Sequence, residues 1–523
     1  MASGLGGTFM PAENKILRLI LGDQLNLDHS WFKRTDNDIL YVMMEVRQET
    51  DYVKHHIQKV LAFFAAMRQF AHQLEERGHR FYYIKLDDPA NTQSIPENLS
   101  RIIQKHKIAR FEYQLPDEFR LDRQMRRFCD SLPIPSRAED TEHFLTCRNE
   151  VAGFFEGKKH YLLESFYRMM RRRHNILMEN DRPIGGVWNY DKENRQPYGG
   201  EVPVPEPVTF ENDTADLMTL LRKNGIETIG SIEKQALIWP VNRRQAEEVL
   251  AFFTGHCLPW FGRYEDAMAK RHWSMFHSRL SFALNSKMLH PMETVNAALQ
   301  AWERNKTRIT LAQIEGFVRQ VIGWREYMRG VYWAQMPEYE KLNFFDHDCR
   351  LPHYYWDGET RMQCLRCCIR QSLEYAFAHH IQRLMITGNF ALLAGIHPDQ
   401  VDAWYMGIYI DAIQWVEITN TRGMSQFADG GIIATKPYVS SARYISKMSD
   451  YCSECHYDPA VKYGDRACPF NSLYWTFYQR HRSKLSKNPR IAMMYRVFDR
   501  FTNEEQGKIL DQGQRYLDNI EYL

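Results

Sequence analysis

The chain has 523 residues, and at roughly 100–200 residues per domain this length predicts two or three domains. Lys and Arg number 67 and Asp and Glu 65, so a formal net charge of +2 excludes a strongly basic tail protein and a self-repelling acidic one. A hydrophobic content of 44% excludes a disordered chain, and no apolar run approaches the length of about 18 residues that a transmembrane helix needs.

The first nine residues, 1–9, precede a second Met and are interpreted as a cloning remnant or a disordered leader. No secretion signal opens the chain, so we expect a cytoplasmic protein of bacterial type, without a membrane partner and monomeric.

Residues 10–145 alternate predicted strands and helices. The strands are expected over 16–21, 38–44, 81–86 and 108–113, with helices over 54–77 and 117–131 and a stop at Gly78. This alternation predicts an α/β domain with a Rossmann-like parallel sheet. No GxGxxG motif or P-loop accompanies it, so a dinucleotide is not the expected ligand.

Polar residues follow two of these strands. Ligands of parallel sheets bind at the carboxyl ends of strands, which makes these residues candidates for a ligand site: Gly22, Asp23, Gln24, Glu45 and Arg47.

The middle of the chain, 146–235, is expected to hold interdomain helices and a long loop, because Pro and Gly crowd residues 180–210. From 236 to 523 the strand pattern disappears and amphipathic helical stretches take over, which predicts a large all-α domain.

Three cysteines, Cys452, Cys455 and Cys468, have the spacing of a metal-binding cluster. A fourth ligand would complete the set, and spacing alone leaves four candidates: Cys349, Cys364, Cys367 and Cys368. Zinc, an iron–sulfur cluster and inert thiols all stay open at this point.

Several motifs together resemble the photolyase/cryptochrome flavoproteins. Residues 273–281 (WSMFHSRLS), 323–327 (GWREY) and 404–422 are similar to the family's flavin-binding segments. Residues 379–385 (HHIQRLM), 420–431 and the cysteine cluster resemble its iron–sulfur branch, the prokaryotic (6-4) photolyases.

The resemblance implies light-dependent repair of (6-4) photoproducts by electron transfer from reduced FAD to a flipped-out lesion in UV-damaged DNA, single- or double-stranded. It selects Cys364 as the distant ligand of a [4Fe-4S] cluster. It implies an FAD site made of Tyr264, His277, Ser278, Arg279, Leu280, Trp324, Glu326, Tyr327, Arg383, Asp411 and Asn420.

Three residues are expected to act on the lesion. His379 and His380 are suited to proton transfer near neutral pH, and Glu417 is expected between flavin and lesion. Four aromatic residues are expected to relay electrons during photoreduction of the flavin: Trp404, Trp356, Tyr405 and Tyr444.

DNA contact requires local positive charge. Residues 476–496 carry six Lys or Arg and no acid, and the phosphate contacts are expected at Arg480, Arg482, Lys484 and Lys487. Asp191 and Arg195, in the Pro- and Gly-rich loop, are expected to reach the lesion.

The resemblance also implies an antenna pigment, 6,7-dimethyl-8-ribityllumazine, at the strand ends of the α/β domain. The sequence leaves open a requirement for a divalent cation. The principal alternative to repair is a blue-light receptor (cryptochrome) of the same fold, since fold alone does not decide function. Cyclobutane-dimer repair and a nucleic-acid-binding iron–sulfur protein without photochemistry are further alternatives.

Overall fold

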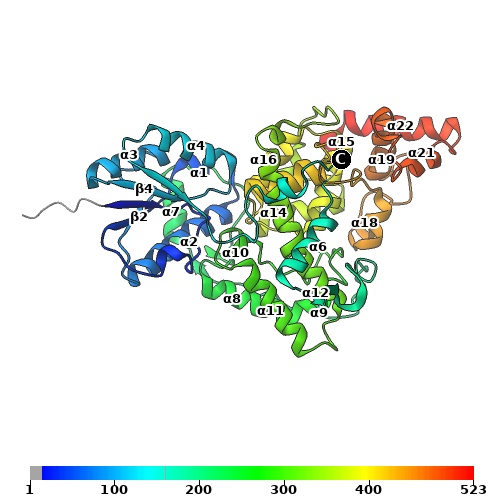
Figure 1. Cartoon of the computed structure of the whole chain (residues 1–523). Helices are drawn as coiled ribbons and strands as arrows, with labels where there is room; N and C mark the ends of the chain where they lie inside the picture. Colours follow the sequence, from blue (N-terminus) through cyan, green and yellow to red (C-terminus); the bar gives the residue numbers. More distant parts are fainter. Residues whose placement is uncertain (1–14, 159–160) are drawn as a thin grey trace, which may run out of the picture.

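The computed structural model describes residues 15–158 and 161–523, so the predicted leader, 1–9, lies outside the described residues. A sheet domain formed by the N-terminal residues stands beside a larger helical domain (Figure 1). The predicted fold class is therefore confirmed. No helix in the described part is long and apolar enough to cross a membrane.

The sheet has five strands in the order β3-β2-β1-β4-β5, and every neighbouring pair is parallel. Its strands are β1 Ile16–Leu19, β2 Ile39–Met44, β3 Phe81–Ile84, β4 Arg110–Gln114 and β5 Ser136–Glu139. All six residues of β2 are buried, because helices cover both faces of the sheet. The edge strand β5 (SRAE) was not predicted, since its residues are mostly exposed and polar.

Helices cover the two faces of the sheet. They are α1 Arg47–Thr50, α2 Ile57–Glu76, α3 Ile95–His106 and α4 Phe119–Ser131. Tyr41 and Met43 of β2 share a hydrophobic core with α2, whereas Leu40 and Val42 share one with α3 and α4. Gly78, with a φ of +85°, follows the end of α2 as predicted.

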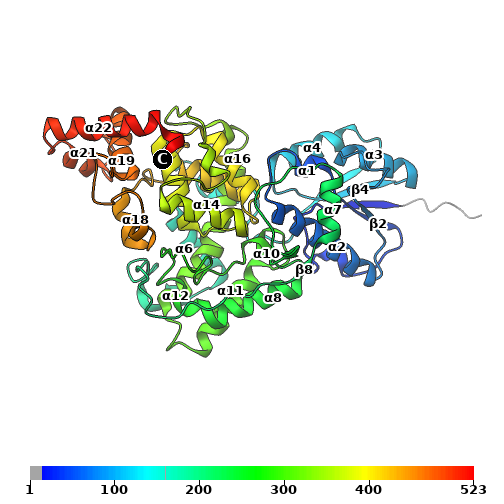
Figure 2. The same ribbon diagram turned by 180° about the vertical axis from the view of Figure 1, so that it is seen from behind.

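The middle segment crosses between the domains. Helices α5 Glu150–Phe154 and α6 Leu163–His174 belong with the helical domain. After the short hairpin β6 Met178–Glu179 and β7 Arg182–Pro183, a long loop leads to β8 Asn212–Asp213. Helix α7 Ala215–Lys223 then lies against the sheet domain, beside α2 (Figure 2). Short strand β9 Ala236–Leu237 pairs with β8.

The helical domain follows from residue 243. Its helices are α8 Arg243–Phe252, α9 Leu258–Phe261, α10 Ser281–Asn285, α11 Pro291–Arg304, α12 Leu311–Val318, α13 Glu326–Gln335, α14 Gln363–Tyr375, α15 Asn389–Ala394, α16 Pro398–Ile408, α17 Gln414–Ile418, α18 Ala442–Met448, α19 Pro469–Arg480, α20 Arg482–Leu485, α21 Ala492–Phe498 and α22 Asn503–Asp518. Three π-helical segments, Arg319–Arg325, Gln382–Gly388 and Thr419–Ser425, fall within or beside the motifs described above. Such segments are frequent at functional sites.

Candidate functional site

The two adjacent histidines lie where a helix begins, and one residue separates them from the π-helical segment Gln382–Gly388. His379 is buried, and neither of its ring nitrogens has a hydrogen-bond partner among the described residues. Its ring stacks on that of His277, with centroids 4.3 Å apart. Burial lowers the pKa of His379 well below its usual value and that of His277 to about 3, so both rings are neutral near pH 7. A buried ring with two unpaired nitrogens fits a polar group of a ligand.

His380 is exposed and faces a buried carboxylate. Its Nε2 lies 3.7 Å from Oδ1 of Asp266, and the hydroxyl of Tyr444 donates to Oδ2 of Asp266 over 3.2 Å. Burial opposes ionisation of Asp266, but the neighbouring His380 and Arg195 hold the pKa of this carboxyl below its usual value. The structure therefore places Tyr444 in this polar cluster, whereas the sequence predicted it for the electron relay.

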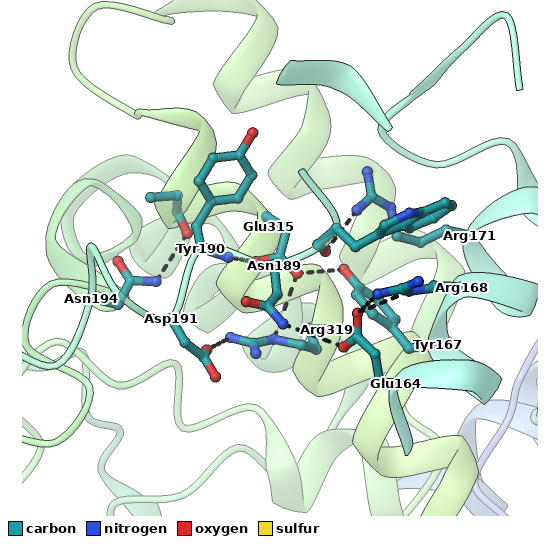
Figure 3. Close-up of polar contacts among 12 residues, drawn as sticks. Glu164, Tyr167, Arg168, Arg171, Asn189, Tyr190, Asp191, Asn194, Glu315 and Arg319 are labelled. Atoms are coloured by element: carbon teal, nitrogen blue, oxygen red, sulfur yellow. Dashed lines mark hydrogen bonds and ion pairs between the residues drawn. The ribbon is translucent and has the colours of Figure 1, made fainter. Parts of the chain in front are cut away.

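Polar contacts anchor the Pro- and Gly-rich loop on the helical domain (Figure 3). The backbone N–H of Tyr190 donates to Glu315 over 3.1 Å, and Asp191 pairs with Arg319. Nε of Arg195 lies 3.1 Å from Oε1 of Glu265, the neighbour of Asp266. The loop residues predicted to reach the lesion are thus next to the His380 cluster.

A second ion pair lies deeper in the helical domain. Nη2 of Arg383 lies 3.0 Å from Oδ1 of Asp411, and the guanidinium sits 3.7 Å above the ring of Tyr409. Glu417, which is buried, accepts a 2.6 Å hydrogen bond from Thr421. Burial raises the pKa of Glu417. The predicted pair Arg383–Asp411 is thus present, with Glu417 in the same buried region.

Arg279 is a buried cation without a carboxylate partner among the described residues. Its Nη2 donates to the carbonyl oxygen of Val208 over 2.7 Å, and its guanidinium lies 5.3 Å from the centroid of the Trp273 ring. Burial lowers the pKa of Arg279 to about 10. Leu280 beside it is buried, and the Ser278 hydroxyl accepts from the backbone N–H of Leu280. A desolvated positive charge of this kind fits a bound anion.

A chain of aromatic rings surrounds Trp404. The buried Trp404 indole lies 5.2 Å from the Tyr355 ring and 5.2 Å from the Tyr405 ring, measured between centroids. Its Nε1 donates to the carbonyl oxygen of Tyr355 over 2.9 Å. Trp356, which follows Tyr355 in the sequence, is 39% exposed. Trp404 and Tyr405 therefore lie side by side in the interior, and Trp356 reaches the surface.

Four thiols meet in one cavity. Cys364 from α14 joins Cys452, Cys455 and Cys468 in its lining, whereas Cys367 and Cys349 do not line it. Burial and the neighbouring thiols raise the pKa of Cys364 well above its usual value and that of Cys452 to about 11. Of the four candidates that spacing left open, the structure brings Cys364 to the other three. A bound metal centre would favour the thiolate forms that burial disfavours.

A pocket opens at the carboxyl ends of β1 and β4, where the strand order reverses direction. Gly22 and Asp23 line it, together with His55, whose two ring nitrogens are buried without partners among the described residues. About 910 Å³ of empty space lies between the lining residues, its open mouth included. Apolar side chains complete the wall, notably Phe63 and Phe64. This combination fits a planar ligand with polar edges.

The other three predicted strand-end residues do not line this pocket. Nε of Arg68 on α2 lies 2.6 Å from the buried Glu45 carboxylate, and Arg47 donates to the carbonyl oxygen of Asn224 at the end of α7. Gln24 accepts from Leu21 in its own turn. Each of these side chains makes a local or interdomain contact, and their part in an antenna site stays a prediction.

The basic run 476–496 is partly neutralised. Arg482 pairs with Asp499 and Lys484 with Asp346, and the Nη2 of Arg480 donates to the carbonyl oxygen of Leu393 over 3.0 Å. Lys487 is exposed, and no ion pair includes it within the described ranges. Of the four predicted phosphate contacts, Lys487 is thus the one with a free charge and no polar partner.

Known proteins resemble this chain in sequence. The family described as "Deoxyribodipyrimidine photo-lyase-related protein" matches residues 18–237. A (6-4) photolyase of Agrobacterium fabrum is 40% identical over 508 residues, which is 97% of this chain and 99% of that protein. The chain belongs to the photolyase/cryptochrome family.

Two solved structures of the photolyase/cryptochrome family share the fold. A bacterial class III photolyase from Agrobacterium tumefaciens superposes with a TM-score of 0.54 at 15% identity, covering 84% of this chain and 83% of that one. A cryptochrome from Synechocystis gives a TM-score of 0.55 at 13% identity, covering 83% and 86%. At these identities the likeness concerns the fold alone.

Other predicted flavin residues of this photolyase/cryptochrome chain have partners of their own. Buried Glu326 accepts from Thr146 over 2.8 Å, and Tyr327 donates to the carbonyl oxygen of Tyr161 over 2.7 Å. Asn420 donates to the carbonyl oxygen of Val416, and Tyr264 donates to Glu201. Glu326 and Tyr327 thus hold the interdomain segment, and their contact with a flavin stays a prediction. The motif that suggested them, Trp324 included, lies partly in a π-helical segment.

Sequence reasoning missed several residues of these sites. The aromatic ring of Tyr355 beside Trp404, the unpartnered His55, and Asp266 beneath His380 are examples. Asp266 lies more than a hundred residues before His380, and no local pattern could have joined the two.

Proposed function

We propose that this protein repairs (6-4) pyrimidine–pyrimidone photoproducts in DNA in a light-dependent reaction. A relative named (6-4) photolyase spans nearly the whole chain, which supports repair by a DNA photolyase. The observation that carries the proposal is the histidine pair, a buried neutral His379 beside an exposed His380.

In this proposal the lesion hydroxyl returns from one base to the other with help from the histidines. His380 supplies the proton, because its ring is exposed and Asp266 orients it from below. His379 is neutral and its ring nitrogens are free to bond a polar group of the ligand. Asp191 and Arg195 bring the anchored loop to the same place, where it contacts the flipped-out lesion.

Membership of the family implies FAD as the cofactor, and residues of this chain fit it. Arg279 offers an uncompensated buried cation to the diphosphate, with His277, Ser278 and Leu280 in the same stretch. Arg383 and Asp411 would lie at the ring, and Glu417 between ring and lesion. When bound, FAD supplies light absorption and the electron. Trp404, Tyr405 and Trp356 would carry electrons inward during photoreduction.

We further propose a [4Fe-4S] cluster on Cys364, Cys452, Cys455 and Cys468. Four thiols in one cavity support a metal centre, and the family resemblance favours iron and sulfide over zinc. The cluster would brace the C-terminal helices. Iron and acid-labile sulfide per chain distinguish it from zinc.

The pocket at the strand ends is the proposed site of a lumazine antenna. Gly22, Asp23 and His55 supply polar contacts and Phe63 and Phe64 an apolar wall. UV-damaged DNA is the proposed partner. The protein is proposed to act as a monomer in the cytoplasm. Repair reactions with Mg²⁺ or EDTA test whether repair requires a divalent cation.

The test is repair of an oligonucleotide that carries one (6-4) photoproduct, with photoreduced protein, a dark control, and parallel reactions with Mg²⁺ or EDTA. Recovery of normal thymines only in the light is the expected result. A matched oligonucleotide with one cyclobutane dimer reports lesion specificity, and single- and double-stranded substrates report strand preference. Bound FAD without light-dependent repair of either lesion would overturn the proposal in favour of a blue-light receptor.

A further inference from the structure

Two glutamine side chains in the helical domain pair with each other. Nε2 of Gln382 donates to Oε1 of Gln371 over 2.9 Å, and Nε2 of Gln371 donates to Oε1 of Gln382 over 3.0 Å. Gln371 lies in α14, and Gln382 opens the π-helical segment that follows the histidines. Gln382 is buried, so its amide exchanges no hydrogen bonds with water.

Gln382 caps the helix that carries the histidines. The backbone N–H of His379 donates to Oε1 of Gln382 over 3.0 Å, and the N–H of Arg383 donates to the carbonyl oxygen of His379 over 3.1 Å. His379 is therefore the N-cap residue and Gln382 stands at the third helical position. A Gln side chain that reaches back to the N-cap N–H is one arm of a capping box, and it fixes where the helix begins.

The other end of the same amide reaches the segment that bears the cysteines. Nε2 of Gln382 donates to the hydroxyl of buried Tyr451 over 3.1 Å, and Tyr451 directly precedes Cys452. The Tyr451 hydroxyl also lies 3.9 Å from Sγ of Cys368. Gln371 in turn donates to the carbonyl oxygen of Trp273, at the start of the stretch that holds Arg279.

We infer that Gln382 is a positioning residue that ties the Tyr451–Cys452 segment to the histidine pair. The inference rests on the proposed function for its effect on repair, but the tether itself is a property of the folded chain. Loss of the Tyr451 hydroxyl leaves the Gln382 amide one acceptor short in a buried place, so the cap on His379 loosens although Tyr451 itself does not touch the histidines. His379 and His380 then lose their fixed orientation toward His277 and Asp266.

Two variants of the holoprotein test the link between Tyr451 and Gln382 from its two ends. Tyr451→Phe removes only the hydroxyl, and Gln382→Glu keeps an acceptor for the His379 N–H but removes the donor to Tyr451. Tyr495→Phe is the matched control, because it deletes another buried hydroxyl hydrogen bond, that to the carbonyl oxygen of Tyr478. Each protein is measured for iron and flavin per chain, amide hydrogen exchange of the peptide 377–384, and the pH profile of repair.

In Tyr451→Phe we expect full iron and flavin content, faster exchange of peptide 377–384, repair slowed about three- to tenfold, and a shifted pH profile. Gln382→Glu should also speed the hydrogen exchange of peptide 377–384 and shift the pH profile of repair. The double variant should differ little from either single variant in these two measurements. The control should match the wild type.

Wild-type exchange and an unshifted pH profile in Tyr451→Phe with intact iron would overturn the inference. If Tyr451→Phe loses iron, Gln382→Glu decides by the same criteria, since it leaves Tyr451 in place. If the wild type itself shows no repair, the proposed function fails while the exchange of peptide 377–384 still decides whether the tether exists.

Discussion

At the scale of single residues, Arg279 is a side chain whose role in ligand binding can be distinguished from a role in the stability of the fold. Its guanidinium is buried and donates to one backbone carbonyl, and no carboxylate balances its charge within the described part of the chain. Such a group is unfavourable in the empty protein and favourable once an anion binds.

We expect Arg279→Gln to weaken flavin binding about ten- to a hundredfold, because a charge-assisted hydrogen bond is worth about 1.5–3 kcal/mol. The flavin-free variant should unfold at a temperature no lower than flavin-free wild type. Flavin absorbance per chain after desalting and thermal unfolding of both forms measure the two effects. Arg244→Ala, on the surface of α8, is the control. Undiminished flavin retention would remove Arg279 from the diphosphate site.

The residue scale also shows what a sequence can and cannot predict. Gly22 and Asp23 were placed correctly at the pocket, because the carboxyl ends of parallel strands meet at one edge of a sheet. Glu45 also follows the carboxyl end of a strand, but its side chain does not line the pocket, since Arg68 from α2 binds its carboxylate. That ion pair depends on how a helix packs across the sheet, and periodicity along the chain carries no such information. The roles of these residues stay predictions.

At the scale of elements, the basic run 476–496 contains cations that form ion pairs and cations that form none among the described residues. Arg482 and Lys484 of α20 are paired with Asp499 and Asp346. Lys487 and Arg490, in the turn that follows, are exposed and belong to no ion pair among residues 15–158 and 161–523. Burial raises the pKa of Tyr438, and the nearby cations Arg195 of the anchored loop and Arg490 of the turn oppose that rise. Arg195 and Arg490 are thus both near Tyr438.

We therefore expect the double change Lys487→Ala and Arg490→Ala to weaken binding of damaged DNA and to reduce the slope of log K against log salt by roughly 2. The double change Arg482→Ala and Lys484→Ala is the matched control, and it should alter the slope much less. Fluorescence-anisotropy titrations between low and physiological salt measure both. Equal slopes in the two variants would exclude a phosphate-contacting role for the turn.

The same element shows why a charge count alone misplaces contacts. The sequence indicated six equivalent cations, and the folded chain gives carboxylate partners to two of them. The carboxylates responsible lie 17 and 138 residues away, in other elements. Strands and helices were mostly predictable from local patterns, whereas these pairings depend on tertiary structure.

At the scale of the whole molecule, one buried lysine joins the two domains. Nζ of Lys287, just after α10, lies 2.9 Å from Asp23 and 2.6 Å from Asp117, at the ends of β1 and β4. Lys287 is fully buried and Asp117 nearly so. Burial raises the pKa of Asp23 to about 6 even in the presence of Lys287.

Lys287→Met should lower the free energy of unfolding by about 3–5 kcal/mol at pH 8, because it takes the ion-pair partner from buried Asp117 and from the partly buried Asp23. The loss should shrink toward pH 5. The carboxyls of the variant have pKa values raised in the folded state, so the folded form takes up protons as the pH falls and is stabilised. Urea unfolding at both pH values measures this, with the exposed Lys508→Ala as control. A loss that is independent of pH would show that packing, not charge, sets the effect.

The return of α7 to the sheet domain has a consequence for synthesis. The five strands of the sheet end by residue 139, and the next helices belong to the helical domain. Helix α7, which ends at Lys223, then packs beside α2 in the sheet domain. The backbone N–H of Ile57 donates to the carbonyl oxygen of Ile229. A ribosome that has released only the first 145 residues therefore exposes the flank of α2 that α7 later covers. The first domain of this protein is finished only after the polypeptide has begun the second, and any chaperone that protects the nascent chain has to hold it through that interval.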